Sequence, residues 1–265
     1  MNMKLNDADA PVLVEKLGAH VVMVTINRPL VRNAINGDVT QALDRAWKQV
    51  EADPDARVAI LSAAGDQVFC AGADLKEIAA GNREKLFTAE GGFAGFVHAK
   101  RSKVWIAAVN GIAVGGGTEI ALACDMVVAA ETASFGLPEV KRSLMALAGG
   151  IYRLARAIPR NIALEMIATG EPIDAARAYQ LGLVSRVVPA HALRDTAIKL
   201  AETISANAPM AVRESVALAR SAADLTEAEL RAAGEAARLR LYATDDFLEG
   251  PRAFIERRAP NWSGR

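Results

Sequence analysis

Apolar residues follow two different spacings along the first 190 residues, and the two spacings alternate. The apolar runs at residues 12–15 and 21–26 predict two strands of a hairpin that turns around Gly18. From Asn36 onward apolar residues recur at helical spacing, so we expect a helix with Asn36 as its N-cap. Further buried strands are predicted by three short apolar runs, at residues 57–62, 104–109 and 126–130. Strands that alternate with helices in this way indicate an α/β architecture with parallel pairing.

The pattern changes to helices alone beyond Pro189. An apolar stripe at helical spacing covers residues 193–204, and such a narrow stripe is typical of a helix that packs on its own domain or on a neighbouring subunit. We therefore expect two regions, a core of residues 1–190 and a helical oligomerisation region of residues 191–265.

Three segments carry more specific local signals. Thr226 and Glu229 have the spacing of a capping box, so a helix is expected to begin there. Residues 244–256 predict one more helix, interrupted near Pro251 because proline removes a helical hydrogen bond. Residues 81–100 are the least regular part of the chain, and the run Gly-Gly-Phe-Ala-Gly-Phe at residues 91–96 predicts a flexible loop within them.

Composition narrows the class of protein. The chain has 265 residues, of which 52% are hydrophobic, so it can bury a substantial core. Lys and Arg together number 31, as do Asp and Glu, and this balance lacks the basic excess of a nucleic-acid-binding protein. Residues 1–11 do not resemble a secretory signal, and no apolar run reaches the roughly 20 residues of a membrane span. Cys70 and Cys124 lie in apolar runs and are expected to be buried, reduced thiols of a cytoplasmic protein.

Two loops of small residues carry most of the chemical information. Residues 69–75 read Phe-Cys-Ala-Gly-Ala-Asp-Leu, and residues 110–119 read Asn-Gly-Ile-Ala-Val-Gly-Gly-Gly-Thr-Glu. Each loop follows a predicted buried strand and opens a predicted helix, where free backbone N–H groups can bind an anion. Two such sites that face each other would form an oxyanion hole. The alternative to an anion site is that these glycines only permit a tight turn. A nucleotide site is not indicated, because the phosphate-binding and dinucleotide-binding glycine motifs are both absent.

Glu119 and Glu139 are the candidate acid–base residues. Glu119 falls early in an otherwise apolar predicted helix, where it could move a proton or only complement the helix dipole. Glu139 follows Leu-Pro, and its alternative is a surface ion pair with Lys141 or Arg142.

The remaining polar residues indicate little further chemistry. The histidines His20, His98 and His191 lack ligand spacing, so no metal site is expected. No Gly-x-Ser-x-Gly run is present, which argues against an acyl-enzyme hydrolase. Turn, cap or structural roles are expected for three aspartates, Asp66, Asp74 and Asp125.

Taken together, these motifs resemble those of the crotonase family, also called the enoyl-CoA hydratase/isomerase family. They span nearly the whole chain, at residues 26–29, 33–34, 69–75, 107–111, 115–119, 123–125, 135–139, 149–150 and 178–188. The resemblance implies an α/β fold built as a spiral of ββα units, followed by an all-helical trimerisation region. It also implies a homotrimer or a homohexamer, a role in fatty-acid or lipid metabolism, and no nucleic-acid or membrane partner.

The resemblance assigns roles to individual residues. The oxyanion hole falls on the backbone N–H groups of Ala73 and Gly116, with the thioester oxygen between them. Contacts to the CoA part of the substrate fall on Arg28, Ala34, Ala71, Asp74, Leu75 and Lys76. Phe254 and Arg257 match tail positions that reach a neighbouring subunit's CoA site in some members.

The two glutamates match the paired glutamates of hydratases within the family. Their presence favours hydration of a 2-enoyl-CoA or the reverse dehydration, with Glu119 as the water-activating base and Glu139 as the acid. Sequence alone leaves these two roles interchangeable. The resemblance implies no metal and no redox cofactor, since CoA is part of the substrate.

Within the family, the loop at residues 91–95, residues 133–139 and the C-terminal end are similar to those of members that dehydrate carnitinyl-CoA. The chain departs from the family pattern at residues 143–148, where a usual proline is missing and the segment is more apolar. The resemblance implies that this segment helps to line the acyl pocket. An apolar lining suits an alkyl or aryl enoyl chain better than a trimethylammonium group, which prefers aromatic or acidic walls.

Three other activities would use the same motifs. A double-bond isomerase needs one glutamate as a proton shuttle and adds no water. A non-catalytic acyl-CoA-binding subunit would keep the N–H groups of Ala73 and Gly116 but has little use for two carboxylates. An acyl-CoA hydrolase would use the same oxyanion site and release free CoA.

Overall fold

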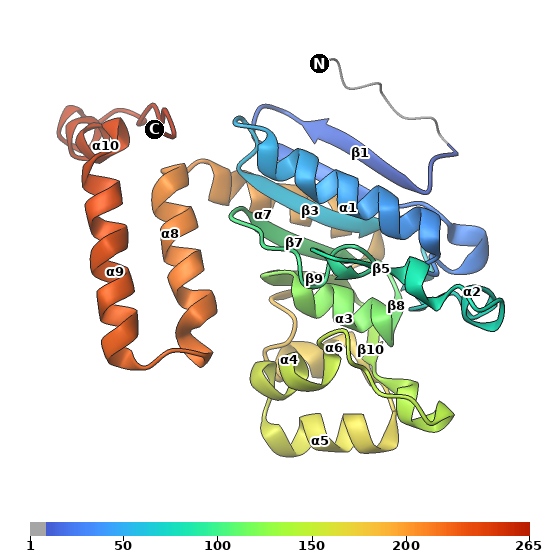
Figure 1. The fold of residues 1–265 in the computed structure, drawn as a ribbon. Helices are drawn as coiled ribbons and strands as arrows, with labels where there is room; N and C mark the ends of the chain where they lie inside the picture. Colours follow the sequence, from blue (N-terminus) through green and yellow to red (C-terminus); the bar gives the residue numbers. More distant parts are fainter. Residues whose placement is uncertain (1–8) are drawn as a thin grey trace.

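The centre of the molecule is a six-stranded sheet (Figure 1). The computed structural model describes residues 9–265. The sheet has the strand order β1 (Val12–Leu17), β2 (Val21–Ile26), β3 (Val58–Ala63), β7 (Val104–Val109), β9 (Met126–Ala130) and β12 (Arg186–Val188). β1 and β2 form an antiparallel hairpin, and every later neighbour in the sheet pairs in parallel. The predicted hairpin, the three predicted buried strands and the parallel pairing are confirmed.

Both faces of this sheet are covered. Alternate residues of β2 belong to two separate apolar clusters: Val22 and Val24 lie in one, whereas Val21 and Met23 lie in the other. A strand that is buried on both faces needs apolar residues at successive positions, which explains why these strands appear as continuous apolar runs in the sequence.

A second, smaller sheet has four strands, and a repeated strand–strand–helix unit builds most of it. Its order is β11 (Ile173–Asp174), β10 (Ser134–Gly136), β8 (Ile112–Val114) and β4 (Val68–Cys70). Three times in succession, a strand of the large sheet is followed by a strand of the small sheet and then by a helix: β3, β4 and α2 (Leu75–Ala79); β7, β8 and α3 (Gly116–Ala123); β9, β10 and α4 (Gly150–Ala157). This repetition confirms the expected succession of ββα units.

Helices cover the first face of the large sheet. α1 (Gly37–Ala52) begins at Asn36, whose side chain accepts the N–H of Val39 at 3.0 Å, as the sequence predicted. α1 buries Leu43, Trp47 and Val50 in the larger apolar cluster.

Two more helices, α5 (Arg160–Thr169) and α6 (Ala175–Gln180), follow α4. Short 3-10 helices lie at Pro29–Val31, Arg83–Leu86, Pro138–Arg142, Ala190–Ala192 and Ser221–Ala223.

Residues 81–100 are more regular than the sequence indicated. A two-stranded hairpin, β5 (Phe87–Thr88) with β6 (Gly92–Phe93), forms within them. Tertiary contacts hold it, because Phe93 is buried and Thr88 donates its hydroxyl to Asp44 on α1 at 2.9 Å. The strands are too short to produce a recognisable alternation. The prediction of a flexible loop at residues 91–96 is wrong where β6 forms and where Phe93, Ala94 and Phe96 are buried.

The C-terminal helices divide by their packing. α7 (Leu193–Ser205) lies on the second face of the large sheet, where Leu193, Ala197 and Ala201 join the smaller apolar cluster. α8 (Pro209–Arg220), α9 (Glu227–Tyr242) and α10 (Asp245–Glu256) form an arm beside the sheet (Figure 1). The change to helices alone near residue 190 matches the sequence, but by packing α7 belongs to the core.

The predicted local signals of the arm are partly confirmed. Thr226 and Glu229 form the capping box at the start of α9. The interruption predicted near Pro251 is wrong, because α10 continues through it. Pro251 is exposed, so its ring has room on the solvent side and costs the helix a hydrogen bond without ending it.

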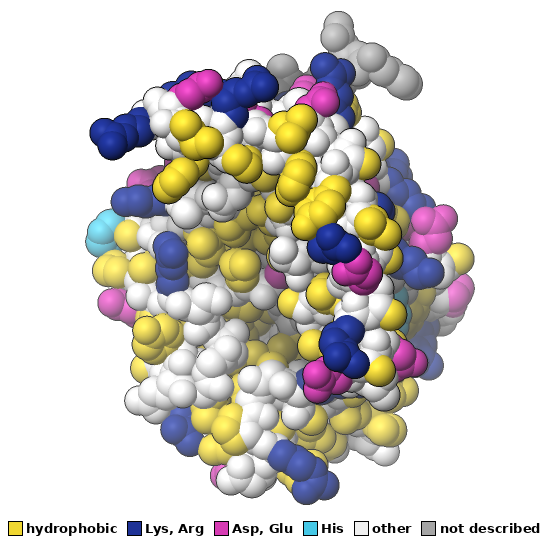
Figure 2. Space-filling model, turned by 90° about the vertical axis from the view of Figure 1, so that its left-hand side faces the viewer, with side chains coloured by type: hydrophobic (Ala, Val, Ile, Leu, Met, Phe, Trp, Pro, Cys, Tyr) yellow, Lys and Arg dark blue, Asp and Glu magenta, His cyan; other side chains and the backbone are white. Residues whose placement is uncertain are grey.

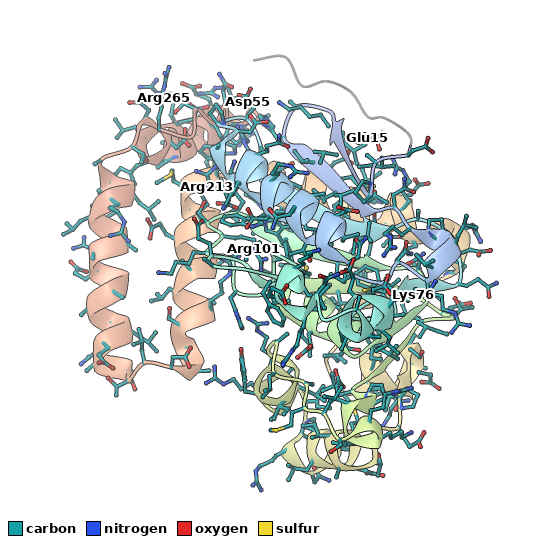
Figure 3. The ribbon with its side chains drawn as sticks, turned by 45° about the vertical axis from the view of Figure 1, so that its right-hand side comes forward. Glu15, Asp55, Lys76, Arg101, Arg213 and Arg265 are labelled. Carbon is teal, nitrogen blue, oxygen red and sulfur yellow. The ribbon has the colours of Figure 1, made fainter. Side chains whose placement is uncertain are left out.

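The chain end ties the arm to the core. The Trp262 indole N–H donates to Ala206 O at 2.9 Å, directly after α7. Asp246, which is buried, accepts the N–H groups of Ser263 at 2.7 Å and of Gly264 at 3.0 Å. Figure 3 shows Arg265 and Asp55 at the same end of the molecule, consistent with this return of the chain.

A wide groove of about 1270 Å³ lies between α4 and α8. Its charged side chains are largely paired: Arg220 binds Asp125 at 2.7 Å, and Arg156 binds Asp224 at 2.9 Å. Figure 2, which faces the side of the arm, shows hydrophobic side chains gathered around a hollow on this face. In the described part of the chain, no helix is long and apolar enough to cross a membrane.

Candidate active site

The two small-residue loops meet through their glycines. A Cβ atom added to Gly72 would lie 3.0 Å from the backbone nitrogen of Gly116 and 3.1 Å from Val114 O. Gly72 also has a φ of +84°, which L side chains rarely adopt. Because both contacts are to backbone atoms, this close approach of the loops requires glycine.

The two N–H groups predicted for the oxyanion hole have no partner among the described residues. Ala73 pairs with Ile35 in an isolated β-bridge, in which Ile35 N–H donates to Gly72 O and Asp74 N–H donates to Ile35 O, both at 2.8 Å. The Ala73 N–H therefore points away from Ile35. Gly116 is the first residue of α3, where a helix has no partner for its N–H groups. Within residues 9–265, neither of these two N–H groups donates to a protein acceptor.

A carboxyl group and a phenyl ring lie against the glycines that open α3. The position of a Cβ on Gly115 is 3.0 Å from Glu139 Oε1. The corresponding position on Gly116 is 2.5 Å from Phe93 Cε1. Phe93 in turn packs edge-on against Phe87, with their ring centroids 5.8 Å apart.

Glu119 is a buried carboxyl group at the start of α3. Glu119 is only 4% exposed, and its side-chain Oε1 accepts the N–H of Gly150 at 2.9 Å. Burial, and next the charge of nearby Glu139, raise the pKa of Glu119 to about 7, against the opposing effect of the Gly150 hydrogen bond. A solvated charge that only complements the helix dipole would not be buried in this way.

Glu139 lies in the 3-10 helix Pro138–Arg142. Burial raises the pKa of this carboxyl group, and the nearby charge of Arg142 opposes the increase. Its Oε2 atom is buried and has no hydrogen-bond partner among the described residues. The alternative ion pair with Lys141 is wrong, because Lys141 binds Glu171 at 2.6 Å.

The structure brings three of the predicted CoA contacts together. Arg28 Nη1 donates to Ala34 O at 2.6 Å and to Asp74 Oδ2 at 3.2 Å. Asp74 also caps α2, as its Oδ1 accepts the N–H of Lys76 at 3.1 Å. Leu75 and Lys76 are exposed on the first turn of that helix, and Figure 3 shows Lys76 far from the arm.

Phe254 and Arg257 lie elsewhere. Phe254, 85% exposed, is near the end of α10, and Arg257 directly follows that helix. In Figure 1, α10 and α2 are at opposite ends of the molecule. Within one chain these two residues are therefore separate from the rest of the predicted site.

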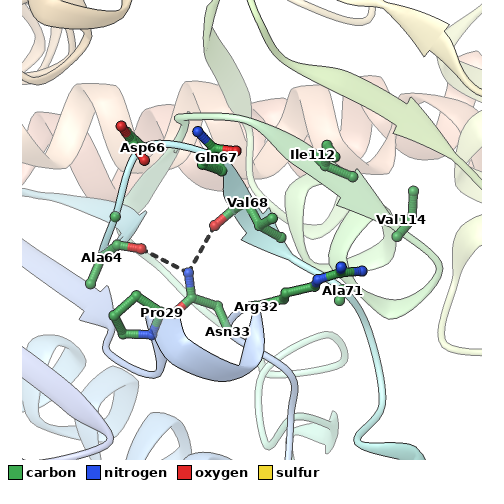
Figure 4. A pocket seen from close by; sticks show the side chains of 11 residues that line it. Pro29, Arg32, Asn33, Ala64, Asp66, Gln67, Val68, Ala71, Ile112 and Val114 are labelled. Atoms are coloured by element: carbon green, nitrogen blue, oxygen red, sulfur yellow. Dashed lines mark hydrogen bonds between the residues drawn. The ribbon is translucent and has the colours of Figure 1, made fainter.

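A pocket of about 350 Å³ adjoins the first loop (Figure 4). Ala71 is the predicted site residue that it contains; the other lining residues are Pro29, Arg32, Asn33, Ala64, Gly65, Asp66, Gln67, Val68, Ile112 and Val114. Asn33, which is buried, holds its wall together by donating its amide to Ala64 O at 2.9 Å and to Val68 O at 2.8 Å.

The sequence did not point to two residues of the site, Phe93 beside Gly116 and Gly150 beside Glu119. Phe93 lay in a segment predicted to be a loop, and only its place after two glycines could have drawn attention to it. Gly150 was noted as one of a glycine pair, without a role. A Cβ there would lie 2.9 Å from Leu137 Cδ2 and 3.0 Å from Glu119 Cγ, so the glycine makes room for the glutamate.

The cysteines lie outside this chemistry. Both are free, and burial raises the pKa of each thiol to about 12. Within residues 9–265, no three His, Cys, Asp or Glu side chains are grouped so that they could hold a metal ion.

Comparison with known proteins places this site in a family. The model of the enoyl-CoA hydratase/isomerase family matches residues 16–265. A crystal structure of enoyl-CoA hydratase from Mycobacterium tuberculosis H37Rv is 40% identical, with a TM-score of 0.92, over 97% of this chain and 100% of that one. The chain is 41% identical to (E)-benzylidenesuccinyl-CoA hydratase of Thauera aromatica, over 96% of this chain and 99% of the relative. It is 38% identical to carnitinyl-CoA dehydratase of Proteus mirabilis, over 92% and 95% respectively.

The chain therefore belongs to the enoyl-CoA hydratase/isomerase family. It is an enzyme of the enoyl-CoA hydratase type, which is a hydro-lyase.

Proposed function

We propose that this enzyme catalyses the reversible syn hydration of a 2-enoyl-CoA thioester at the site formed by α3 and the Pro138–Arg142 helix. The observation that carries the proposal is the placement of two carboxyl groups, buried Glu119 and half-buried Glu139, near the glycines of α3 and α4. Buried carboxyl groups with raised pKa values are typical of acid–base catalysis near neutral pH.

The two free N–H groups are the proposed oxyanion hole. Addition of water at C3 moves negative charge through C2 onto the thioester oxygen. Donors from Ala73 and Gly116 stabilise this charge where it develops, and one such donor is typically worth about 10²–10³ in rate. Neither donor would first have to break a bond to the protein.

The glutamates divide the proton transfers between them. Glu119 removes a proton from the water that attacks C3, and Glu139 gives a proton to C2. The unpartnered Oε2 of Glu139 is free to bind water or substrate, which supports a direct role. In the reverse reaction the same groups exchange roles. We propose that neither a metal ion nor a redox cofactor takes part.

The CoA part of the substrate is assigned to the side of the first loop. The Arg28–Asp74 pair holds the loop that carries Ala71, Leu75 and Lys76, and the pocket of Figure 4 adjoins it. A basic group at Lys76 and an exposed apolar group at Leu75 suit a ligand that has both phosphates and an adenine ring.

The relatives support the reaction type with different acyl groups. By their names, the Proteus relative acts on carnitinyl-CoA and the Thauera relative on (E)-benzylidenesuccinyl-CoA. Dehydration of carnitinyl-CoA is thus a second candidate, supported by an identity of 38%.

We propose that the protein is a cytoplasmic homotrimer or homohexamer with a role in fatty-acid or lipid metabolism. The arm supports the assembly part of this proposal. Several large apolar side chains of the arm are exposed, among them Leu239, Leu248, Phe254 and Ile255. Through the last turn of α10, a neighbouring subunit would bring Phe254 and Arg257 to the CoA site.

The proposal is tested by incubating the purified protein with crotonyl-CoA and following the loss of enoyl-thioester absorbance, with mass spectrometry of the product. A gain of one water supports hydration. Release of free CoA would indicate a hydrolase, whereas consumption of a 3-enoyl-CoA without added water would indicate an isomerase. Binding of these thioesters without any turnover would indicate a non-catalytic subunit.

A further inference from the structure

Arg153, on α4, connects two segments of the candidate site. Its Nη2 donates to Val97 O at 2.6 Å, and its Nη1 donates to Ala148 O at 3.3 Å. Val97 belongs to the segment that follows β6, whereas Ala148 comes directly before the glycine pair at the start of α4. One guanidinium group thus holds together two segments that are far apart in the sequence.

The bond to Val97 fixes the phenyl ring beside Gly116. The Val97 N–H donates to Phe93 O at 3.2 Å, so Val97 and Phe93 are held within one turn of the chain. The Phe93 ring lies against Gly116, whose N–H is one of the two proposed oxyanion donors. Hydrogen bonds from a charged guanidinium are stronger than those from neutral donors. Arg153 therefore fixes the position of the Phe93 ring beside this donor.

The bond to Ala148 fixes the segment that is bonded to Glu119. Gly150 donates its N–H to Glu119 Oε1 at 2.9 Å. Gly149, which lies between Ala148 and Gly150, has a φ of +112°, and a Cβ at this position would clash with Arg153 Nη1. Glycine at position 149 therefore permits the guanidinium to reach the Ala148 carbonyl.

Arg153 also acts on Glu119 through its charge. Burial raises the pKa of Glu119, and the positive charge of Arg153 opposes this increase. Burial, and next the charge of Arg153, lower the pKa of His98. The other titratable groups that interact electrostatically with Arg153 or Glu119 are Glu139, Tyr152, Cys124 and Arg101. Arg153 thus favours the carboxylate form that the proposed base requires.

We propose that Arg153 is a positioning residue of the hydratase site, which holds the segment bonded to Glu119, fixes the Phe93 ring beside Gly116 and stabilises the carboxylate form of Glu119. This inference rests on the proposed function and assigns Arg153 no contact with the substrate. The alternative is a purely structural role, in which Arg153 only fastens α4 to the segment after β6. The two roles differ in whether the effect of Arg153 depends on the charge of Glu119.

The kinetics of Arg153→Met test the role, because methionine is unbranched like arginine and lacks the charge and the donors. We expect kcat for crotonyl-CoA, or for the best enoyl-CoA, to fall by roughly tenfold or more, since small displacements of catalytic groups are costly. KM should change little, because Arg153 is not among the predicted CoA contacts. The ratio of kcat/KM at pH 8 to kcat/KM at pH 6 should increase, because Glu119 without Arg153 loses its proton at a higher pH.

Two further variants separate charge from hydrogen bonding. Arg153→Lys keeps the charge but lacks the planar fork of donors, so it should lose kcat several-fold and retain the parent's pH ratio. Arg156→Met is the matched control, since Arg156 lies on the same helix, is exposed and pairs with Asp224 at 2.9 Å. It should leave both kcat and the pH ratio unchanged.

A second measurement requires no turnover. Urea denaturation of the parent, Arg153→Met, Glu119→Gln and the double variant gives the coupling between these two side chains. At pH 8 Arg153→Met should change the unfolding equilibrium constant several-fold more in the parent than in Glu119→Gln, and this excess should shrink at pH 5, where Glu119 is protonated. The titration of His98 contributes equally in both backgrounds and cancels.

Turnover of Arg153→Met close to that of the parent would overturn the inference. A loss of kcat with an unchanged pH ratio and no pH-dependent coupling to Glu119 would also overturn it, in favour of the structural role. If Arg153→Met does not fold, parent-like kcat in Arg153→Lys would contradict the proposal. Failure of the hydratase function is distinct, because then the parent adds water to no enoyl-CoA, and the coupling still decides whether Arg153 acts on Glu119.

Discussion

Glu119 illustrates how burial gives a residue its chemistry. Its sequence position, early in an apolar helix, was compatible with a solvated charge, and the structure excludes that because the carboxyl group lies against Gly150 and close to Glu139. A glutamate whose pKa is about 7 can exchange a proton in either direction near neutral pH. If Glu119 is the base, the hydration rate should increase as the pH rises through about 7, because the carboxylate form is the active one.

The same burial should affect stability. The folded-state pKa of about 7 lies above the ordinary value of 4.5, so the folded protein binds this proton more tightly than the unfolded chain. The resulting stabilisation is full below about pH 4.5 and is lost as the pH rises through 7. Glu119→Gln keeps the acceptor for Gly150 and cannot titrate.

The free energy of unfolding of this variant, relative to that of the parent, should therefore increase by about 2–3 kcal/mol between pH 5 and pH 8. Urea denaturation at the two pH values measures it. If the difference in free energy of unfolding between variant and parent were the same at pH 5 and pH 8, Glu119 would not be buried as described.

Gly72 can be tested against a glycine with the same backbone strain. Gly72→Ala should lose stability from its positive φ and, in addition, displace the Gly116 nitrogen that it would meet at 3.0 Å. Gly182→Ala has nearly the same φ, +83°, and nothing within 4 Å of its Cβ. Both variants should be destabilised by about 1 kcal/mol or more, but only Gly72→Ala should also lose turnover, by roughly tenfold or more. Equal turnover in the two variants would contradict the claim that Gly72 positions the Gly116 N–H of the proposed oxyanion hole.

At the scale of elements, the sequence predicted those whose signal is local. The cap at Asn36 and the capping box at Thr226 use side chains within the same turn, and both are present. The hairpin β5–β6 was missed because tertiary contacts of Phe93 and Thr88 hold it, and no periodicity appears in strands of two residues. The proline in α10 was overinterpreted, since the effect of a proline depends on which side of the helix faces solvent.

The capping box of α9 should contribute to stability independently of catalysis. Thr226→Ala removes the acceptor of the Glu229 N–H and should lower the free energy of unfolding by about 1 kcal/mol, as is typical for an N-cap. Thr226→Ser retains the hydroxyl and should cost much less. Chemical denaturation of the three proteins measures both effects, and an equal loss in the two variants would argue against the cap.

At the scale of the whole molecule, the succession of ββα units explains how the two small-residue loops come together. Each unit places a loop between a strand and a helix, and the repetition brings residues 69–75 next to residues 115–119. That contact joins two segments far apart in the sequence, so their spacing alone could not reveal it. The pocket beside Arg32 and Ile112 depends on the same contact between units and was not predicted.

The arm should control assembly. Deletion of residues 225–265 removes α9, α10 and the return of Trp262 to Ala206, and it exposes the face of α8 that α9 covers. We expect monomers or aggregates in place of a trimer or hexamer, measured by size-exclusion chromatography with light scattering. A stable trimer of the shortened chain would contradict an assembly role for this region.

The most direct test of the central claim is the turnover of crotonyl-CoA, or of the best enoyl-CoA, by Glu119→Gln and Glu139→Gln. Both variants keep the size and the hydrogen-bonding capacity of the side chain and lose only the titratable proton. Each should bind the thioester with nearly unchanged affinity and lose turnover by at least about 10²-fold, the range of general acid–base catalysis. Turnover close to that of the parent enzyme in either variant would contradict the role assigned to that glutamate.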